Sequence, residues 1–442
     1  MNKATVIGAG LAGCEAAWQL AKRNIEVTLI EMKPDKKTPA HSADTFAELV
    51  CSNSLRSDRL ENAVGLLKEE MRRLGSLIME CADENKVEAG GALAVDRNGF
   101  SEAVTARIEA CPLITVEHRE VTEVPKEGWT IIASGPLTAD ALAEDIRRYF
   151  GGAKYLSFYD AAAPLVSFDS IDMENAFFAS RYDRGTPDYI NCPMDKEQYT
   201  AFQQELVNAQ EAEVHGFEDS SVFEGCMPIE VMARRGVDTM RYGPMKPVGL
   251  ADPRTGREAY AVVQLRKDNQ TGTIYNIVGF QTHLKFPEQK RVFSMIPALK
   301  NAEFLRYGVM HRNTYIDSPR LLGANFSVKD EPRLAFAGQM TGVEGYVESA
   351  ASGYLAAVAM ACRILGEPEP DFTRKTAMGA LAAYVSDPSV MKFQPMNVNF
   401  GIMDQLEYRV KGKKNKYAEV ARRSLELIDR IVGKDKADED NS

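Results

Sequence analysis

Two segments of the chain place a cysteine among residues that can activate its sulfur. The first, A-E-L-V-C-S-N-S-L-R-S-D, carries Cys51 with Arg56 and Arg59 close behind it. The second, F-E-G-C-M-P-I-E-V-M-A-R-R-G, carries Cys226 ahead of two arginines. A neighbouring cation lowers the pKa of a thiol, and the thiolate is the nucleophilic form. Any single cysteine is more often a small buried apolar residue, so the two are candidate catalytic thiols because of their neighbours alone.

A glycine-rich turn near the N-terminus predicts a dinucleotide-binding site. The turn reads G-A-G-L-A-G and consists of Gly8, Ala9, Gly10, Leu11, Ala12 and Gly13. In this motif the first glycine permits a tight turn, the second lets the backbone approach a pyrophosphate, and the third lets helix and strand pack closely. Glu31 follows eighteen residues after Gly13, where an acidic side chain accepts hydrogen bonds from ribose hydroxyls. The alternative is a structural turn in a βαβ unit that binds nothing.

A second turn far along the chain distinguishes FAD from NAD as the expected dinucleotide. The segment R-L-A-F-A-G-Q-M-T-G-V-E-G-Y-V-E-S-A-A-S-G has the pattern of a strand, a glycine-rich turn and a helix, with Gly338, Gln339, Gly342 and Tyr346 at the turn. Enzymes that bind FAD use such a second turn at the flavin end, so the pair of turns favours FAD over NAD. Another strand-turn-helix unit without a cofactor role is the alternative interpretation.

The charges are segregated along the chain. The net charge is -10, yet the segment Arg234 to Arg312 holds fourteen basic residues against six acidic ones. A second basic segment, Lys392 to Arg423, holds eight against three and includes Lys411, Lys413 and Lys414. Two histidines with aromatic and cationic neighbours, His283 and His311, lie in the first segment. These residues are candidate substrate contacts on a basic surface, although a solvated lysine run and structural histidines are the more ordinary interpretations.

The elements that position these residues follow from the hydrophobic pattern. Apolar runs at Ala4–Ile7 and Glu26–Glu31 flank a helical pattern at Leu11–Arg23, which predicts a βαβ unit and a parallel sheet. Further strands are expected at 129–135 and 334–338, the latter followed by a helix at Tyr346–Cys362. We therefore expect an α/β fold with an FAD-binding, doubly wound (Rossmann-like) domain formed by residues 1–160 and 321–442. Residues 161–320, rich in turns and short alternating runs, predict an inserted α+β domain.

Composition limits the remaining possibilities. The chain has 442 residues, with 45% hydrophobic and 26% charged, as in an ordinary globular protein. No apolar run reaches the length of a membrane span, and the N-terminus lacks a signal-peptide pattern. We therefore expect a cytoplasmic protein without membrane partners. The seven cysteines include no C-x-x-C pair, so no metal site is expected.

Four motifs together resemble one family. G-A-G-L-A-G-C-E-A-A-W, E-L-V-C-S-N-S-L-R, F-E-G-C-M-P-I-E and A-G-Q-M-T-G-V-E-G-Y-V-E-S-A-A-S-G are similar to segments of the bacterial folate- and FAD-dependent tRNA uracil-5-methyltransferases, the TrmFO family. The flavin motifs are shared with the related GidA/MnmG flavoproteins, which modify the wobble uridine of tRNA. The cysteine motifs are the more specific part, and the short stretch after the second flavin motif favours the methyltransferases.

The resemblance implies an activity and roles for the two thiols. Members of this family methylate C5 of uridine-54 in the T-loop of tRNA, with 5,10-methylenetetrahydrofolate as carbon donor and FAD reduced by NADPH or NADH. The resemblance implies that Cys226 matches the C6 nucleophile and Cys51 a second active-site thiol, acting as a base or a resolving thiol. The sequence also allows the two roles to be exchanged. Tyr346 is similar to a position that contacts the isoalloxazine. A GidA/MnmG-type enzyme, a flavin thiol oxidoreductase and a non-catalytic RNA-interaction protein are the alternatives.

Overall fold

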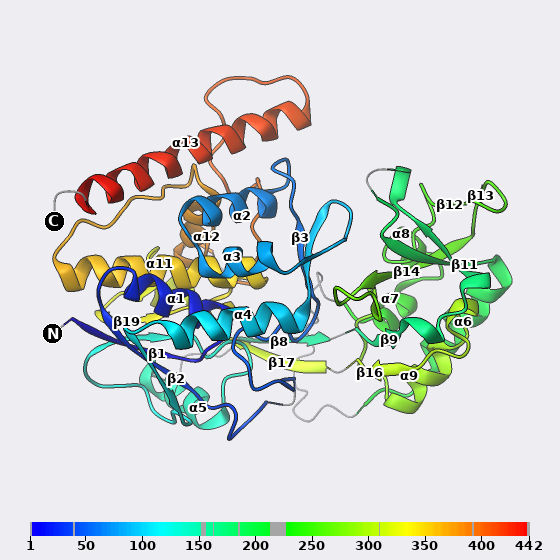
Figure 1. Cartoon of the computed structure of the whole chain (residues 1–442), viewed down its shortest axis with the longest axis horizontal. Helices are drawn as coiled ribbons and strands as arrows, with labels where there is room; N and C mark the ends of the chain where they lie inside the picture. The colour runs from blue at the N-terminus through cyan, green and yellow to red at the C-terminus, as the bar shows by residue number, and fades with distance from the viewer. Residues whose placement is uncertain are drawn as a thin grey trace.

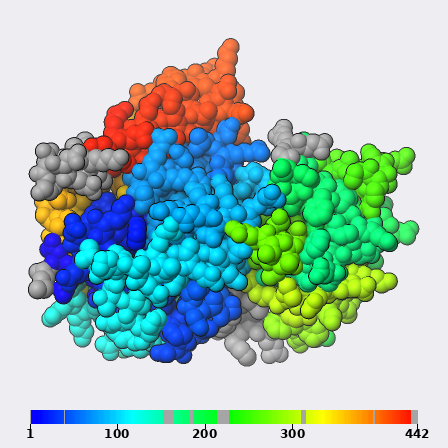
Figure 2. All heavy atoms as spheres, in the orientation of Figure 1, coloured from blue at the N-terminus to red at the C-terminus, as the bar shows by residue number. Residues whose placement is uncertain are grey.

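The computed structural model describes residues 2–38, 40–151, 156–161, 163–183, 186–212, 227–308, 310–390 and 393–439, with only the backbone given at 156–161, 183, 310–314 and 434–439. The chain forms two lobes (Figure 1). The larger contains both chain ends and the smaller is built from the middle of the sequence. Each lobe has its own large cluster of buried apolar side chains. The lobes lie against each other in the space-filling view (Figure 2).

A six-stranded sheet forms the centre of the larger lobe. The strand order is β18-β19-β7-β1-β2-β6, and all neighbours are parallel except the edge strand β18. The strands are β1 (Lys3–Ile7), β2 (Glu26–Glu31), β6 (Ile114–His118), β7 (Trp129–Ile132), β18 (Ser327–Val328) and β19 (Glu331–Phe336). Successive crossovers place β2 and β6 on one side of β1 and β7 and β19 on the other, which is the doubly wound arrangement. The prediction of an α/β, Rossmann-like fold is confirmed.

Helices α1 (Leu11–Ala21) and α11 (Tyr346–Leu365) pack against each other beside this sheet. Both were predicted from the sequence, α1 two residues longer and α11 three residues shorter than observed. Their backbones come so close that a Cβ added to Gly353 of α11 would lie 2.2 Å from the carbonyl oxygen of Ala12. A Cβ on Gly13 would lie 1.8 Å from the carbonyl oxygen of Gly8. Both positions therefore require glycine, because any side chain would prevent these backbone segments from packing so closely.

The rest of the larger lobe covers this unit. A small antiparallel sheet has the order β3-β5-β4 and is formed by Ser54–Ser57, Ala92–Val95 and Lys86–Val87. The covering helices are α2 (Ala63–Arg73), α3 (Leu77–Glu84), α4 (Arg97–Ala110), α5 (Asp140–Tyr149), α10 (Ser318–Leu321), α12 (Ala377–Ser386) and α13 (Lys413–Glu439). Helix α13 lies along the outside of the lobe near α2 (Figure 1), where Arg73 forms an ion pair with Asp429 at 2.7 Å.

The smaller lobe is an antiparallel sheet with helices, which is an α+β arrangement. Its strand order is β10-β11-β14-β15-β9-β16. The strands are β9 (Leu165–Ser167), β10 (Phe177–Ala179), β11 (Tyr189–Met194), β14 (Ala261–Lys267), β15 (Ile274–Ile277) and β16 (Phe304–Arg306). The helices are α6 (Lys196–Asn208), α7 (Ile229–Arg235), α8 (Thr239–Tyr242) and α9 (Phe286–Phe293), with a hairpin of β12 (Ala251–Asp252) and β13 (Arg257–Glu258) beside them.

The chain passes between the lobes along two paired strands. Strand β8 (Leu156–Ala161) leads into the smaller lobe and β17 (Met310–Tyr315) leads out of it. The two strands are antiparallel over their whole length, with Leu156 opposite Tyr315 and Ala161 opposite Met310. The smaller lobe is therefore an insertion whose entry and exit lie side by side.

The close contact between α1 and α11 generates a stability prediction. Gly353→Ala should lower the free energy of unfolding by at least about 1–3 kcal/mol, because the new methyl group meets backbone atoms that cannot move aside cheaply. Denaturant unfolding of the purified protein measures this change. Gly433→Ala in α13 is the control, because nothing lies within 4 Å of its added Cβ, and it should stabilise the helix by up to about 1 kcal/mol. Equal stability of Gly353→Ala and wild type would contradict the packing argument.

Candidate functional site

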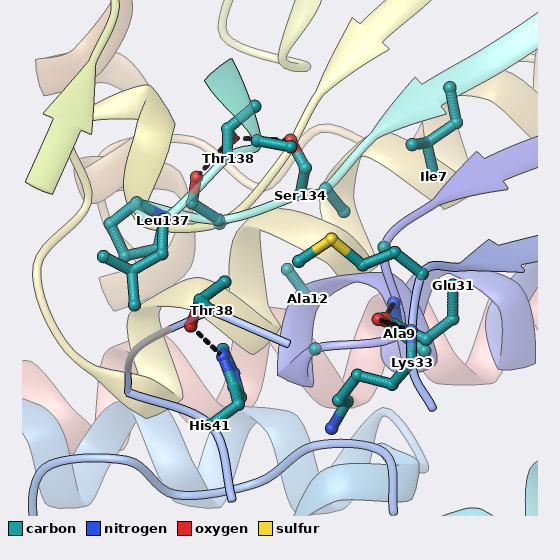
Figure 3. A pocket seen from close by; sticks show the side chains of 18 of the residues that line it. Ile7, Ala9, Ala12, Glu31, Lys33, Thr38, His41, Ser134, Leu137 and Thr138 are labelled. Atoms are coloured by element: carbon teal, nitrogen blue, oxygen red, sulfur yellow. Dashed lines mark hydrogen bonds between the residues drawn. The ribbon is translucent and has the colours of Figure 1, made fainter. Parts of the chain in front are cut away.

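The carboxyl ends of the parallel strands meet at a cavity of about 1130 Å³, a volume that includes its open mouth. Its wall combines the first glycine-rich turn, the end of β2, the turn after β7 and the second glycine-rich turn. Figure 3 shows Ala9, Ala12 and Glu31 on one side of this space and Ser134, Leu137 and Thr138 on another. Ligands of doubly wound folds bind at this edge of the sheet, so the cavity is the candidate cofactor site.

The first turn has the geometry that a pyrophosphate requires. Gly8 has a φ of +97°, and a Cβ there would lie 2.7 Å from the carbonyl oxygen of Ala133. At Gly10 a Cβ would meet nothing within 4 Å, so this side of the backbone is open. The first helical hydrogen bond of α1 runs from Cys14 N–H to the Gly10 carbonyl at 2.9 Å. The amides before it, at the positive end of the helix dipole, are placed to donate to a phosphate.

Glu31 is fixed beside this turn at the end of β2. Its carboxylate is buried and accepts hydrogen bonds from the Ala9 N–H at 2.7 Å and the Lys33 N–H at 3.0 Å (Figure 3). Each oxygen keeps a second lone pair for a ribose hydroxyl. Across the cavity, Thr38 Oγ1 and His41 Nδ1 are 2.6 Å apart, and burial together with the charge of Lys33 lowers the pKa of His41. A neutral imidazole therefore lines the cavity at neutral pH.

The residues predicted at the second turn fall into two groups, those that line the cavity and one that lies behind its wall. Gly338, Gln339 and Tyr346 line the cavity. Gly338 adopts a φ of +83°, and its N–H donates to Ser352 Oγ at 2.7 Å, which ties the turn to α11. Gly342 also has a positive φ, +84°, but a Cβ there would lie 2.3 Å from the ring of Phe393. The structure therefore places Gly342 against Phe393, where it shapes the turn from behind the cavity wall.

Tyr346 connects the cavity to the first cysteine. Its hydroxyl accepts hydrogen bonds from the Cys51 N–H at 2.8 Å and the Ser52 N–H at 3.3 Å. Burial raises the pKa of Tyr346, and a negative charge on Cys51 raises it further, so the phenol stays neutral. These hydrogen bonds hold Cys51 at the end of the cavity that the second turn forms.

Three arginines surround the Cys51 segment. Arg306 Nη2 donates to the Cys51 carbonyl at 3.4 Å, and Arg266 donates to Ser52 Oγ at 2.7 Å. Arg97 donates to the carbonyl of Leu49 and forms an ion pair with Asp268 at 3.0 Å. Burial lowers the pKa of Arg306, while negative charge on Asp268 and on Cys51 opposes this effect. Arg97 and Arg306 therefore both lie close enough to Cys51 for a negative charge on this residue to raise the pKa of their guanidinium groups.

These arginines were not predicted from the sequence as neighbours of Cys51. Of the two neighbours that the sequence suggested, Arg59 is exposed, and Arg56 turns to the buried carboxylate of Glu348, with which it forms an ion pair. Arg266 carried a usable signal, because a cation within the apolar run A-V-V-Q-L-R-K of a strand requires a buried partner. Nothing in the sequence around Arg97 or Arg306 indicated their role, since their partners lie far away in the sequence.

The other predicted residues are not brought to this cavity within the described part of the chain. Cys226 and the side chain of His311 lie outside the described residues. The buried ring of His283 lies between Glu211, at 2.6 Å, and Glu230, at 2.5 Å. Burial lowers the pKa of His283, but the two carboxylates outweigh it and the net shift is upward. His283 thus has a structural partner on each ring nitrogen, which its aromatic and cationic neighbours in sequence did not indicate.

The lysine run lies at the start of α13, away from the cavity lining. Lys413 lies over the ring of Tyr417, 5.6 Å from its centroid, and Lys414 is 3.6 Å from Glu61. Lys411 and its neighbours in the run are exposed or nearly so. Over the described residues, no group of His, Cys, Asp or Glu is arranged to hold a metal ion. None of the helices described is long and apolar enough to cross a membrane.

Comparison with known proteins supports this architecture. The family model "Glucose inhibited division protein A" matches residues 3–368. Among solved structures, GidA of Aquifex aeolicus superposes with a TM-score of 0.70 at 14% identity, covering 97% of this chain and 73% of that one. A second crystal form gives a TM-score of 0.69 at 16% identity. At these identities the likeness concerns the fold.

Curated relatives are much closer in sequence. Three of them bear the name methylenetetrahydrofolate--tRNA-(uracil-5-)-methyltransferase TrmFO. The protein of Acetivibrio thermocellus is 61% identical over 97% of this chain and 98% of its own length. That of Lactobacillus johnsonii is 57% identical over 99% and 100%, and that of Enterococcus faecalis 55% over 98% and 99%. The chain therefore belongs to the GidA family and, within it, to the methylenetetrahydrofolate--tRNA-(uracil-5-)-methyltransferases.

Proposed function

We propose that this protein is an FAD- and folate-dependent methyltransferase that converts a uridine of tRNA into 5-methyluridine. The observation that supports the proposal is the hydrogen bond from the backbone N–H of Cys51 to the hydroxyl of Tyr346, a residue that lines the candidate cofactor cavity. The names of the relatives supply the substrate and the carbon donor, 5,10-methylenetetrahydrofolate. Uridine-54 of the T-loop is the proposed target, and a cytoplasmic location follows from a tRNA substrate.

The residues of the cavity fit FAD. The amides of the first turn would hold the pyrophosphate, Glu31 the ribose, and Gly338, Gln339 and Tyr346 the flavin end. The carboxylate of Glu31 disfavours a 2′-phosphate in this position, which fits FAD better than NADP. FAD, reduced by NADPH or NADH, would supply the hydride that turns a methylene group into a methyl group.

The two thiols divide the remaining chemistry. We propose that the Cys226 thiolate adds to C6 of the uracil, which turns C5 into an enolate carbon. C5 then bonds to the methylene carbon of the folate, and Cys51 accepts the C5 proton as a general base. Cleavage of the bond between this carbon and the folate nitrogen releases tetrahydrofolate and leaves an exocyclic methylene group on C5. Delivery of hydride to the methylene group and cleavage of the bond between Cys226 and C6 complete the product. The base role requires a Cys51 thiolate, which the charges of Arg97 and Arg306 stabilise.

We further propose that residues 161–320 act as a unit in presenting substrate to the cofactor domain of residues 1–160 and 321–442. The sheet of this middle segment supplies Arg266 and Arg306 to the Cys51 segment. Its basic residues between Arg234 and Arg312, together with Lys411, Lys413 and Lys414, would contact tRNA phosphates. We also propose that His311 contacts the substrate and that His283, which lies between Glu211 and Glu230, contributes by positioning these carboxylates.

Cofactor binding can be tested at Gly10. Wild-type protein should be yellow with non-covalent FAD, Gly10→Ala should bind FAD more weakly, and Gly10→Leu should be colourless. The backbone at Gly10 suits any residue, with φ -76° and ψ -173°, so the larger side chain fills the open side of the turn without straining the fold. Absorbance at the flavin band and the melting temperature measure the two effects. A yellow Gly10→Leu protein with one FAD per chain would refute this role of the turn.

The thiol assignment can be tested with tRNA that contains 5-fluorouracil. Fluorine cannot leave as a proton, so an enzyme with an intact nucleophile should remain covalently attached to this tRNA. Cys226→Ala should form no adduct and produce no 5-methyluridine in ordinary tRNA, as measured by mass spectrometry. Cys51→Ala should still form the adduct but lose methylation. Adduct formation by Cys226→Ala, and none by Cys51→Ala, would exchange the two roles.

The lysine run can be tested through the salt dependence of tRNA binding. Replacing Lys411, Lys413 and Lys414 by glutamine should flatten the plot of log Kd against log salt by up to about 0.9 for each duplex phosphate that the variant no longer neutralises. A matched triple replacement at the exposed residues Lys3, Lys22 and Lys126 should leave the slope unchanged. If both triple variants behave like wild type, the run is an ordinary solvated surface.

A further inference from the structure

Three aromatic rings form a stack at one edge of the second sheet. Tyr307, directly after β16, is stacked on Phe286 with centroids 5.0 Å apart and an interplanar angle of 14°. On its other side it is stacked on Phe304 at 5.5 Å and 9°. Phe286 ends the stack and is 51% exposed. A large aromatic ring held flat at the surface is a ready contact for another planar group.

The stack is held rigidly from behind. The side chain of Gln289 is completely buried and forms two hydrogen bonds of 2.8 Å with the backbone of Gly308, one from Nε2 to the carbonyl and one from the Gly308 N–H to Oε1. Its Nε2 also donates to the carbonyl of Leu284 at 2.6 Å. These bonds fix the segment that carries Tyr307 onto helix α9, which begins with Phe286. A ligand that stacks here would lose little free energy to ordering the rings.

The surroundings of the stack carry positive charge and lie next to the candidate catalytic segment. Lys285 and Lys290, on either side of the first turn of α9, are exposed. Arg306 immediately precedes Tyr307 and reaches the carbonyl of Cys51. Figure 1 shows α9 and β16 next to each other along the lower side of the smaller lobe. The segment that carries the stack therefore also contacts the Cys51 segment through Arg306, and Lys285 and Lys290 are available for phosphates that flank a planar group on Phe286.

We propose that the exposed face of Phe286 binds an unpaired base of the tRNA, adjacent to the uridine that is modified. The proposal rests on the proposed function and deepens it by assigning a subsite for the RNA. Stacking on an aromatic ring is the usual way in which proteins hold bases of single-stranded RNA, and it needs no particular base identity. Lys285 and Lys290 would contact the phosphates on either side of the stacked base.

The test measures the affinity of full-length tRNA for four variants at several salt concentrations. Phe286→Ala should raise Kd by roughly five- to 150-fold, the loss expected for one stacked base. The slope of log Kd against log salt should stay unchanged, because no charge is removed. Phe286→Trp should bind within about twofold of wild type, whereas Phe286→Leu, which keeps apolar area without a ring, should resemble alanine. Phe178→Ala is the control, because Phe178 is 43% exposed on β10, at the opposite edge of the same sheet.

The outcomes separate this subsite from the proposed function. FAD content and melting temperature equal to wild type show that each variant is folded. If wild type binds and methylates tRNA but Phe286→Ala has an unchanged Kd, the stacking subsite is wrong and the proposed function stands. The subsite is also overturned if Phe286→Leu binds like wild type, or if Phe286→Ala loses only its affinity for tetrahydrofolate, which would make a pterin the occupant. Absence of tRNA binding by the wild type overturns both.

Discussion

The buried ion pair between Arg97 and Asp268 joins the two lobes at the candidate active site. Only 11% of the Arg97 side chain and 4% of that of Asp268 are exposed. The same guanidinium also donates to the Leu49 carbonyl, two residues before Cys51. Removing one partner of such a pair leaves a buried charge uncompensated, which typically costs about 3–5 kcal/mol. This ion pair therefore ties the smaller lobe to the Cys51 segment, together with the hydrogen bonds that Arg266 and Arg306 donate to Ser52 and Cys51.

Local patterns predicted the cofactor half of the site well. The spacing of Gly8, Gly10 and Gly13 between two apolar runs predicts a strand, a turn and a helix. In the structure Gly13 packs against Gly8 within the motif, whereas Gly8 packs against Ala133 and Gly10 leaves its side of the backbone open. The second turn was found in the same way. Gly353 illustrates the limit of such patterns, since its lack of a side chain is explained only by the approach of Ala12, which lies more than three hundred residues earlier.

The thiol half of the site was predicted less completely, because its contacts are long-range. Proximity in sequence suggested Arg56 as the cation beside Cys51. Arg56 instead adopts a φ of +64° and pairs with Glu348, so the chain turns this side chain toward α11. The cations that do surround the segment come from α4, β14 and β16. Pairing between Arg97 and Asp268 spans 171 residues, a distance at which neither hydrophobic periodicity nor motif spacing carries information.

Because strands β8 and β17 are paired, the smaller lobe is joined to the larger one at a single place. Because Leu156 lies opposite Tyr315, the two ends of the larger lobe are only about 5 Å apart at this register position, a gap that a two-residue hairpin turn spans. No strand of the six-stranded parallel sheet comes from the inserted segment. A gene could therefore exchange this lobe at a single point and keep every strand of this sheet, although Arg97 would then need a new partner for its buried charge. Recombination at β8 and β17 is thus a structurally simple route by which one flavin scaffold acquires new substrates.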